Sequence, residues 1–283
     1  MQEILEILEH SAIDTIKLLP FLFITYLIME YIEHKTSDKV KETIKKSGKF
    51  GPLIGSVLGI FPQCGFSVSA TNLYATRVIT LGTLISVYLT TSDEMLPILI
   101  TEAVPISTIL QILGIKFVIG IIAGFMIDFV IRKTHKEELD EHIEEFCEHE
   151  HCHCEEGIWK SAIKHSINIL IFIFIVTVII NAIIHLVGEE TIAKIVSHNI
   201  LLGPIIAGLV GLIPNCASSV ILTELFVESV ISMPILIAGL CVNAGVGLLV
   251  LFKTNKNLKE NIKIVSLLYC IGVIAGIILE IIL

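Results

Sequence analysis

The sequence predicts an all-α polytopic membrane protein with two inverted-topology repeats. Each repeat would hold a proline-broken re-entrant hairpin and about three full spans, giving about ten helical segments in all. Three observations predict this fold: nearly uncharged runs of about 20 residues, long enough to cross a bilayer; a match of the chain to itself at one constant displacement; and the placement of the basic residues. The composition agrees, because 54% of the 283 residues are hydrophobic, 17% are charged and mean hydropathy is +0.87. A soluble enzyme is therefore excluded, and the net charge of −9 argues against a nucleic-acid partner.

The two halves of the chain match when one is placed 152 positions after the other, so that Gly51-Pro52 falls on Gly203-Pro204. Further coincidences at this displacement are Gly59/Gly211, Pro62/Pro214, Cys64/Cys216, Gly120/Gly272 and Gly124/Gly276. Coincident Gly, Pro and Cys positions are hard to obtain from apolar composition alone. We predict a membrane repeat at 1–134, a polar linker at 135–159 and a second membrane repeat at 160–283. The last four glycines form small-residue faces that predict close helix contacts.

Each half offers four apolar segments. The expected segments are 13–33, 51–76, 78–100 and 104–131 in the first half, and 164–187, 202–228, 233–252 and 262–283 in the second. The segment 51–76 is interrupted by Pro62, with Gly59 before it and Gly65 after it. Proline removes a backbone donor and disfavours the helical conformation of the preceding residue. The segment is therefore either one kinked span or a re-entrant hairpin of two half-helices.

The basic residues favour the hairpin. They cluster in three loops, at 34–50, at 132–136 with 160–164, and at 253–263. If 51–76 were a simple span, each half would cross four times and the central basic loop would lie outside. If it is a hairpin, all three basic loops and Arg77 lie in the cytoplasm, and the acidic segment 188–200 lies outside. Three crossings per half also invert the second half, an arrangement typical of secondary transporters.

The two hairpin tips carry similar chemistry. One reads Phe61-Pro62-Gln63-Cys64 and the other Ile213-Pro214-Asn215-Cys216, so each offers a thiol and a carboxamide. The half-helix that restarts after each break points its N-terminus inward, where free N–H groups favour an anion or a thiolate. We predict that the two tips meet near the midplane of the bilayer and form one site.

Two adjacent acids, Asp93 and Glu94, lie inside the apolar segment 78–100. Carboxylates in a membrane segment are expensive and indicate a functional site; the alternative is a short loop between two shorter helices. The full set of candidate ligands is Gln63, Cys64, Asn72, Asp93, Glu94, Asn215, Cys216, Glu224 and Asn243. This mixture of oxygen and sulfur ligands fits Mn²⁺, Fe²⁺ or Zn²⁺.

The linker has the composition of a metal-binding segment. Its candidate ligands are Cys147, His149, His151, Cys152, His153 and Cys154. The spacing is not that of a folded zinc finger, so we expect a flexible chelating segment that binds zinc or a similar ion. It would serve in sensing, delivery or buffering of metal, and we expect no other cofactor.

The two Pro-x-Cys tips, the Ser92-Asp93-Glu94 segment and the His/Cys-rich linker resemble the prokaryotic heavy-metal exporters with ten membrane segments. That family is labelled both as manganese transporters and as arsenic efflux proteins. The resemblance extends over nearly the whole chain. It implies export of a metal or metalloid, with the Pro-x-Cys tips as the site.

We therefore expect a non-enzymatic secondary transporter in the cytoplasmic membrane of a prokaryote. It would export a divalent metal cation, with Mn²⁺ as the first choice, in exchange for protons, and it is compatible with a homo-oligomer. The sequence has no phosphate-binding loop for ATP. Three alternatives stay open: an arsenite or organoarsenical permease that uses Cys64 and Cys216, a membrane thiol–disulfide enzyme, and a metal sensor in which the linker is the functional part.

Overall fold

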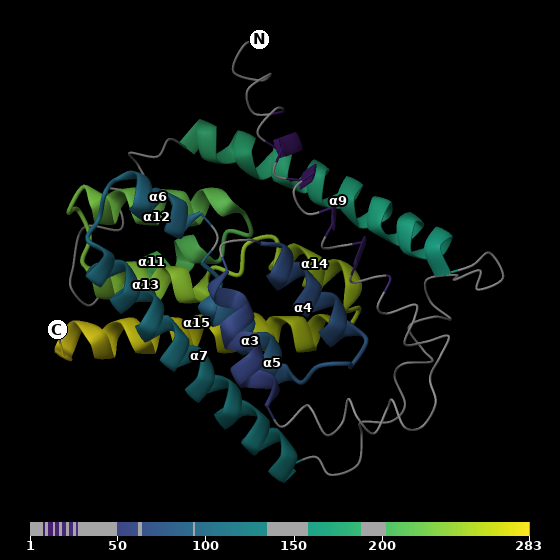
Figure 1. Cartoon of the computed structure of the whole chain (residues 1–283), viewed down its shortest axis with the longest axis horizontal. Coiled ribbons are helices and arrows are strands. Elements are labelled where there is room, and N and C mark those ends of the chain that lie inside the picture. The colour runs from purple at the N-terminus through teal and green to yellow at the C-terminus, as the bar shows by residue number, and fades with distance from the viewer. Residues whose placement is uncertain are drawn as a thin grey trace.

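The computed structural model describes residues 50–61, 64–92, 94–134, 158–187 and 202–282, together with single positions between 8 and 27. Within this described part of the chain, every regular element is a helix (Figure 1). Three helical segments there are long and apolar enough to cross a membrane, namely Ile106–Ile131, Met233–Thr254 and Leu258–Ile282. The predicted all-α polytopic membrane protein is thereby confirmed. The segment 13–33 and the linker 135–157 fall wholly or mainly outside the described residues.

The helices of the two halves begin at corresponding positions. The first half holds α3 (Gly51–Ile60), α4 (Gly65–Ala75), α5 (Leu81–Thr90), α6 (Met95–Thr101) and α7 (Ile106–Thr134). After α9 (Ile158–Val187) come α11 (Leu202–Gly211), α12 (Cys216–Val227), α13 (Met233–Val242), α14 (Gly247–Thr254) and α15 (Leu258–Ile282). Comparing the starts in order, each helix from α11 to α15 begins 151 or 152 positions after its counterpart from α3 to α7.

The segment 51–76 folds as two short helices that run back and forth. Helix α3 lies beside α5 and runs in the same direction, because a Cβ added at Gly51 would meet Thr83 and one added at Gly59 would meet Thr90. Helix α4 then returns the chain from the far end of α3 to the start of α5. Both ends of the segment therefore lie at the same end of α5.

The expected span 78–100 is not one helix, because α5 ends at Thr90 and α6 begins at Met95. The Thr91 hydroxyl donates to the carbonyl of Val87 at 2.7 Å, and the Ser92 hydroxyl donates to that of Thr90 at 3.0 Å. Such local bonds compete with helical backbone bonds and help to end the helix. The alternative, a short loop between two shorter helices, describes the structure around Glu94.

The second half has a break at the corresponding place, which the sequence analysis missed. Helix α13 ends at Val242 and α14 begins at Gly247. Gly245 takes a φ of 54°, a left-handed conformation that glycine adopts without strain. The Asn243 carboxamide oxygen accepts a hydrogen bond from the Gly245 N–H at 2.8 Å and holds this turn.

Helices α5 and α13 form the centre of the molecule. All residues from 82 to 92, and all from 234 to 248, are buried. Helices α7 and α15 pack against α5 and α13, respectively, and expose apolar side chains such as Phe129 and Ile281. In the bilayer such side chains face lipid, so the two outer helices provide the lipid contact and the inner pair provides the core.

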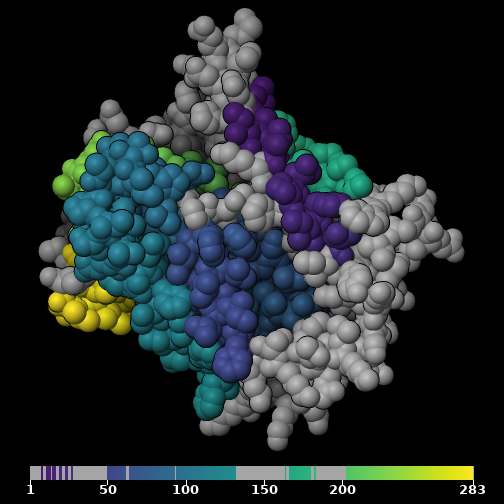
Figure 2. Space-filling model, viewed as in Figure 1, coloured from purple at the N-terminus to yellow at the C-terminus, as the bar shows by residue number. Residues whose placement is uncertain are grey.

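The two halves contact each other reciprocally. Helix α4 packs against α14 of the other half, and α12 packs against α6 (Figure 1). Because α4 corresponds to α12 and α6 to α14, each contact is the counterpart of the other, as in a two-fold symmetric interface. Figure 2 shows one face of the molecule, on which α3 and α4 lie beside the residues of α6 and α7.

A carboxylate lies at the start of each inner helix. The Thr80 hydroxyl and the Gly82 N–H donate to Asp128 at 2.7 and 2.9 Å. In the second half, the Ser232 hydroxyl donates to Glu280 at 2.8 Å. An acid at a helix N-terminus is stabilised by the free N–H groups and by the helix dipole. These two acids therefore have a structural role.

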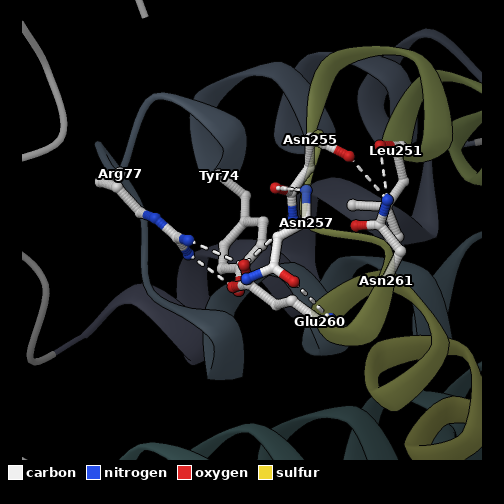
Figure 3. A network of polar contacts seen from close by, with 7 residues as sticks. All are labelled: Tyr74, Arg77, Leu251, Asn255, Asn257, Glu260 and Asn261. Carbon is white, nitrogen blue, oxygen red and sulfur yellow. Dashed lines mark hydrogen bonds and ion pairs between the residues drawn. The ribbon is translucent and has the colours of Figure 1, made fainter. Parts of the chain in front are cut away.

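A polar network joins the halves at the end of α4 (Figure 3). The Arg77 guanidinium donates two hydrogen bonds to the Glu260 carboxylate, at 2.7 and 2.9 Å, and Tyr74 donates a third. Asn255 adds a bond at 3.2 Å. The bonds to Glu260 raise the pKa of Arg77 further above its ordinary value, so the pair stays charged. The network places Arg77 beside the basic loop 253–263.

The predicted glycine faces do bring helices close together. A Cβ added at Gly124 would lie 1.9 Å from the Ser86 hydroxyl oxygen and 2.7 Å from the Gly82 carbonyl oxygen. Its counterpart Gly276 would place a Cβ 2.5 Å from that of Ala238. The pairs α5–α7 and α13–α15 therefore approach at a distance that only glycine allows.

We expect Gly124→Ala to destabilise the protein by about 1–3 kcal/mol, because the methyl group would force α7 away from α5. The measurement is thermal unfolding in detergent. The matched control is Gly114→Ala in the same helix, where an added Cβ meets nothing within 4 Å. Equal unfolding temperatures for the two variants would contradict the close contact.

Candidate metal-binding centre

The centre contains one thiol from each half. Cys64 precedes the first residue of α4, and Cys216 is the first residue of α12. Their sulfur atoms lie 2.9 Å apart, and both side chains are buried. Both helices direct their N-termini toward the pair, where a negative charge is stabilised. One thiophilic ion can therefore contact both sulfur atoms.

The serine hydroxyl groups near the tips donate hydrogen bonds to backbone carbonyls. Ser67 donates to the carbonyl of Cys64, and Ser219 donates to that of Cys216, both at 2.8 Å. The two cysteines otherwise share an apolar cluster with residues that include Val68, Val246, Ile169 and Ile173.

Carboxamides lie close to the tips along the chain. Asn215 directly precedes Cys216 and is buried. Asn72 lies two turns after Cys64 on α4 and is 1% exposed, and neither atom of its amide has a hydrogen-bond partner among the described residues. A buried carboxamide without partners costs about 1–3 kcal/mol. Asn72 therefore retains the capacity to bind a ligand, whereas the oxygen of Asn243 already accepts the bond from Gly245.

The acidic candidates are more widely spread. Glu94 is half-buried and precedes α6, and Glu224 is exposed on α12. Gln63 and Asp93 lie outside the described residues, as do all six candidate ligands of the linker: Cys147, His149, His151, Cys152, His153 and Cys154. Within the described ranges, no group of three or more His, Cys, Asp and Glu side chains is placed to hold a metal. The described residues thus bring together the thiol pair and not a complete ligand set.

Sequence reasoning missed Lys116, which is fully buried in α7. Its ammonium donates to the carbonyl of Thr91 at 2.5 Å and to that of Leu240 at 3.3 Å. The signal was present in the sequence, because Lys116 is the only charged residue between Glu102 and Asp128. A charge within a membrane span indicates a functional site by the rule that singled out Asp93.

The comparison with known families agrees with the resemblance. Residues 4–187 match the family described as "Putative, 10TM heavy-metal exporter". The match covers the first tip, the linker and α9, so it is shorter than the near-complete resemblance expected, and it does not reach Cys216. No curated protein and no solved structure matches the chain. The chain belongs to this ten-segment heavy-metal exporter family and is a polytopic membrane protein.

Proposed function

We propose that this protein is a secondary transporter that exports a thiophilic heavy-metal ion across the cytoplasmic membrane of a prokaryote. The observation that carries the proposal is the 2.9 Å separation of the Cys64 and Cys216 sulfur atoms. The family description supports the export of a heavy metal without naming which one. A site with one ligand from each half suits alternating access, because movement of one half against the other changes the exposure of the bound ion.

The mechanism rests on an inverted repeat. Two facts support it: the constant displacement between corresponding helices, and the return of α4 to the starting end of α5. A segment that enters and leaves on one side adds no crossing, so each half has an odd number of crossings and the second half is inverted. The segments 51–76 and 202–228 are then opposed hairpins, whose tips carry the two cysteines. The basic loops and the linker would lie in the cytoplasm.

The thiol pair favours a soft or intermediate ion. Thiolates prefer Zn²⁺ and softer ions, whereas Mn²⁺ prefers carboxylate and carbonyl oxygens. Mn²⁺ therefore takes second place in the proposal, favoured by the acids Asp93 and Glu94 at the break between α5 and α6. We propose that these acids exchange protons for the metal and so couple export to the proton gradient.

A trivalent arsenical is a further candidate substrate. A monoalkyl arsenic(III) hydroxide has two exchangeable hydroxyl groups, so two thiols saturate it with release of two water molecules. This stoichiometry matches the pair Cys64 and Cys216, and no third His, Cys, Asp or Glu ligand joins them among the described residues. Such transport would not require Asp93 or Glu94.

We expect Cys64→Ser and Cys216→Ser each to lower export by about tenfold or more, because each removes one of two soft ligands. The measurement is uptake of Cd²⁺, Zn²⁺, Mn²⁺ and arsenite into everted membrane vesicles, with and without a pH gradient. Cys270→Ser is the matched control, since Cys270 is exposed on α15. Wild-type export of every substrate by the double variant Cys64→Ser/Cys216→Ser would overturn the assignment of the thiols. If Asp93→Asn lost the export of Mn²⁺ alone, Mn²⁺ would be a substrate that depends on the acids.

We also expect diamide to oxidise the two thiols to one intramolecular disulfide, with the two hydrogens passing to diamide. The sulfur atoms are 2.9 Å apart, and a bond of about 2.05 Å needs only a small shift. The linked peptides are detected by mass spectrometry, and export should stop when the bridge forms. Prior addition of Cd²⁺ should protect the thiols. Absence of the bridge under conditions that modify Cys270 would contradict the proximity.

A further inference from the structure

Lys116 is a buried basic residue in an apolar helix. It lies near the middle of α7 with 0% of its surface exposed, in a span that is otherwise free of charge between Glu102 and Asp128. The corresponding position of the second half is Leu268, which is also fully buried. Packing of this position therefore does not require lysine. A charge kept in a membrane interior at such cost indicates a function.

The ammonium lies where two helices from different halves end. Thr91 follows the last residue of α5, and Leu240 lies in the last turn of α13. Carbonyls in the last turn of a helix lack the helical N–H partners that interior carbonyls have, and they carry the negative end of the helix dipole. Lys116 donates to both, at 2.5 and 3.3 Å. Two such carbonyl groups, one from each half, thus share one positive charge.

Helices α3, α5 and α13, which surround this position, contain no Lys, Arg or His, so Lys116 is the cation that these helices face. Helix α3 carries no titratable group, and the Tyr88 hydroxyl of α5 is 2.5 Å from that of Thr71. In the sequence, Ser92 and the acids Asp93 and Glu94 follow Thr91.

We propose that Lys116 is a tethered substitute for an alkali cation at the junction of the two broken spans. In transporters with broken helices, half-helix C-termini and unwound carbonyls form the sites of coupling Na⁺ ions. Here the same kind of carbonyl pair holds an ammonium group, which carries the same unit charge as Na⁺. The native protein therefore needs no Na⁺, and it becomes Na⁺-dependent when the ammonium is removed. The transport part of this inference rests on the proposed export function, whereas the binding part does not.

The test uses Lys116→Leu, which places the residue of the second half at this position and shortens the side chain enough to leave room for an ion. The first readout is thermal unfolding of the purified full-length protein in NaCl and in N-methyl-D-glucamine chloride. We expect NaCl to raise the unfolding temperature of Lys116→Leu by about 3 °C or more and to leave the wild type unchanged, because a ligand that binds the native state stabilises it. Lys253→Leu, which removes an exposed lysine in the last turn of α14, is the control and should behave as wild type.

The second readout is metal export in vesicles. Without Na⁺, Lys116→Leu should export at least about tenfold more slowly than wild type, because two charge-assisted hydrogen bonds are lost. Addition of NaCl should restore most of the rate. The inference is overturned if Na⁺ stabilises neither or both proteins, or if it fails to restore export by the variant. If the wild type exports no metal but Na⁺ still stabilises Lys116→Leu alone, the proposed function fails and the cation site stands.

Discussion

Backbone groups inside a membrane must find partners within the protein, and this constraint governs the structure. Each half has two helix breaks among the described residues, one before Cys64 or Cys216 and one after Thr90 or Val242. At such breaks, N–H and carbonyl groups lose their helical partners, and lipid offers no replacement. Broken helices are therefore possible only where the rest of the fold encloses them. The buried helices α5 and α13, with α7 and α15 outside them, provide that enclosure.

Different side chains support the breaks. At the second tip the Ser218 hydroxyl donates to the Ile213 carbonyl at 3.2 Å, and the Asn243 carboxamide holds the turn before α14. At the break after α5, the partner of the Thr91 carbonyl is the Lys116 ammonium. The breaks after α5 and α13 are thus supported by polar side chains.

The two halves share a scaffold and differ in charge. Glycine contacts, helix caps and hydroxyl bonds recur at the same displacement, as in the pairs Gly124/Gly276 and Thr80/Ser232. The acids that cap the inner helices, Asp128 and Glu280, recur, but the charges at the central break do not: Lys116 corresponds to Leu268, and Asp93 to Gly245. The first half therefore supplies the charge of Lys116 to the junction where the carbonyls of Thr91 and Leu240 lie. Substitutions at the repeated glycines and caps therefore test the fold, and substitutions at Lys116 and Asp93 test what distinguishes the two halves.

The sequence by itself determined the membrane class, the repeat displacement and the break around Pro62, and it singled out Cys64 and Cys216 as candidate ligands. These features depend on composition, on proline chemistry and on coincident residues, all of which are local. It also carried the signal of Lys116, a lone charge in an apolar span, which was overlooked. Only the tertiary structure decided that the two sulfur atoms lie 2.9 Å apart, that 78–100 is two helices, and that Asn243 supports a turn. Those facts depend on contacts between segments more than 100 residues apart, or on competition between side-chain and backbone hydrogen bonds, which no local pattern encodes.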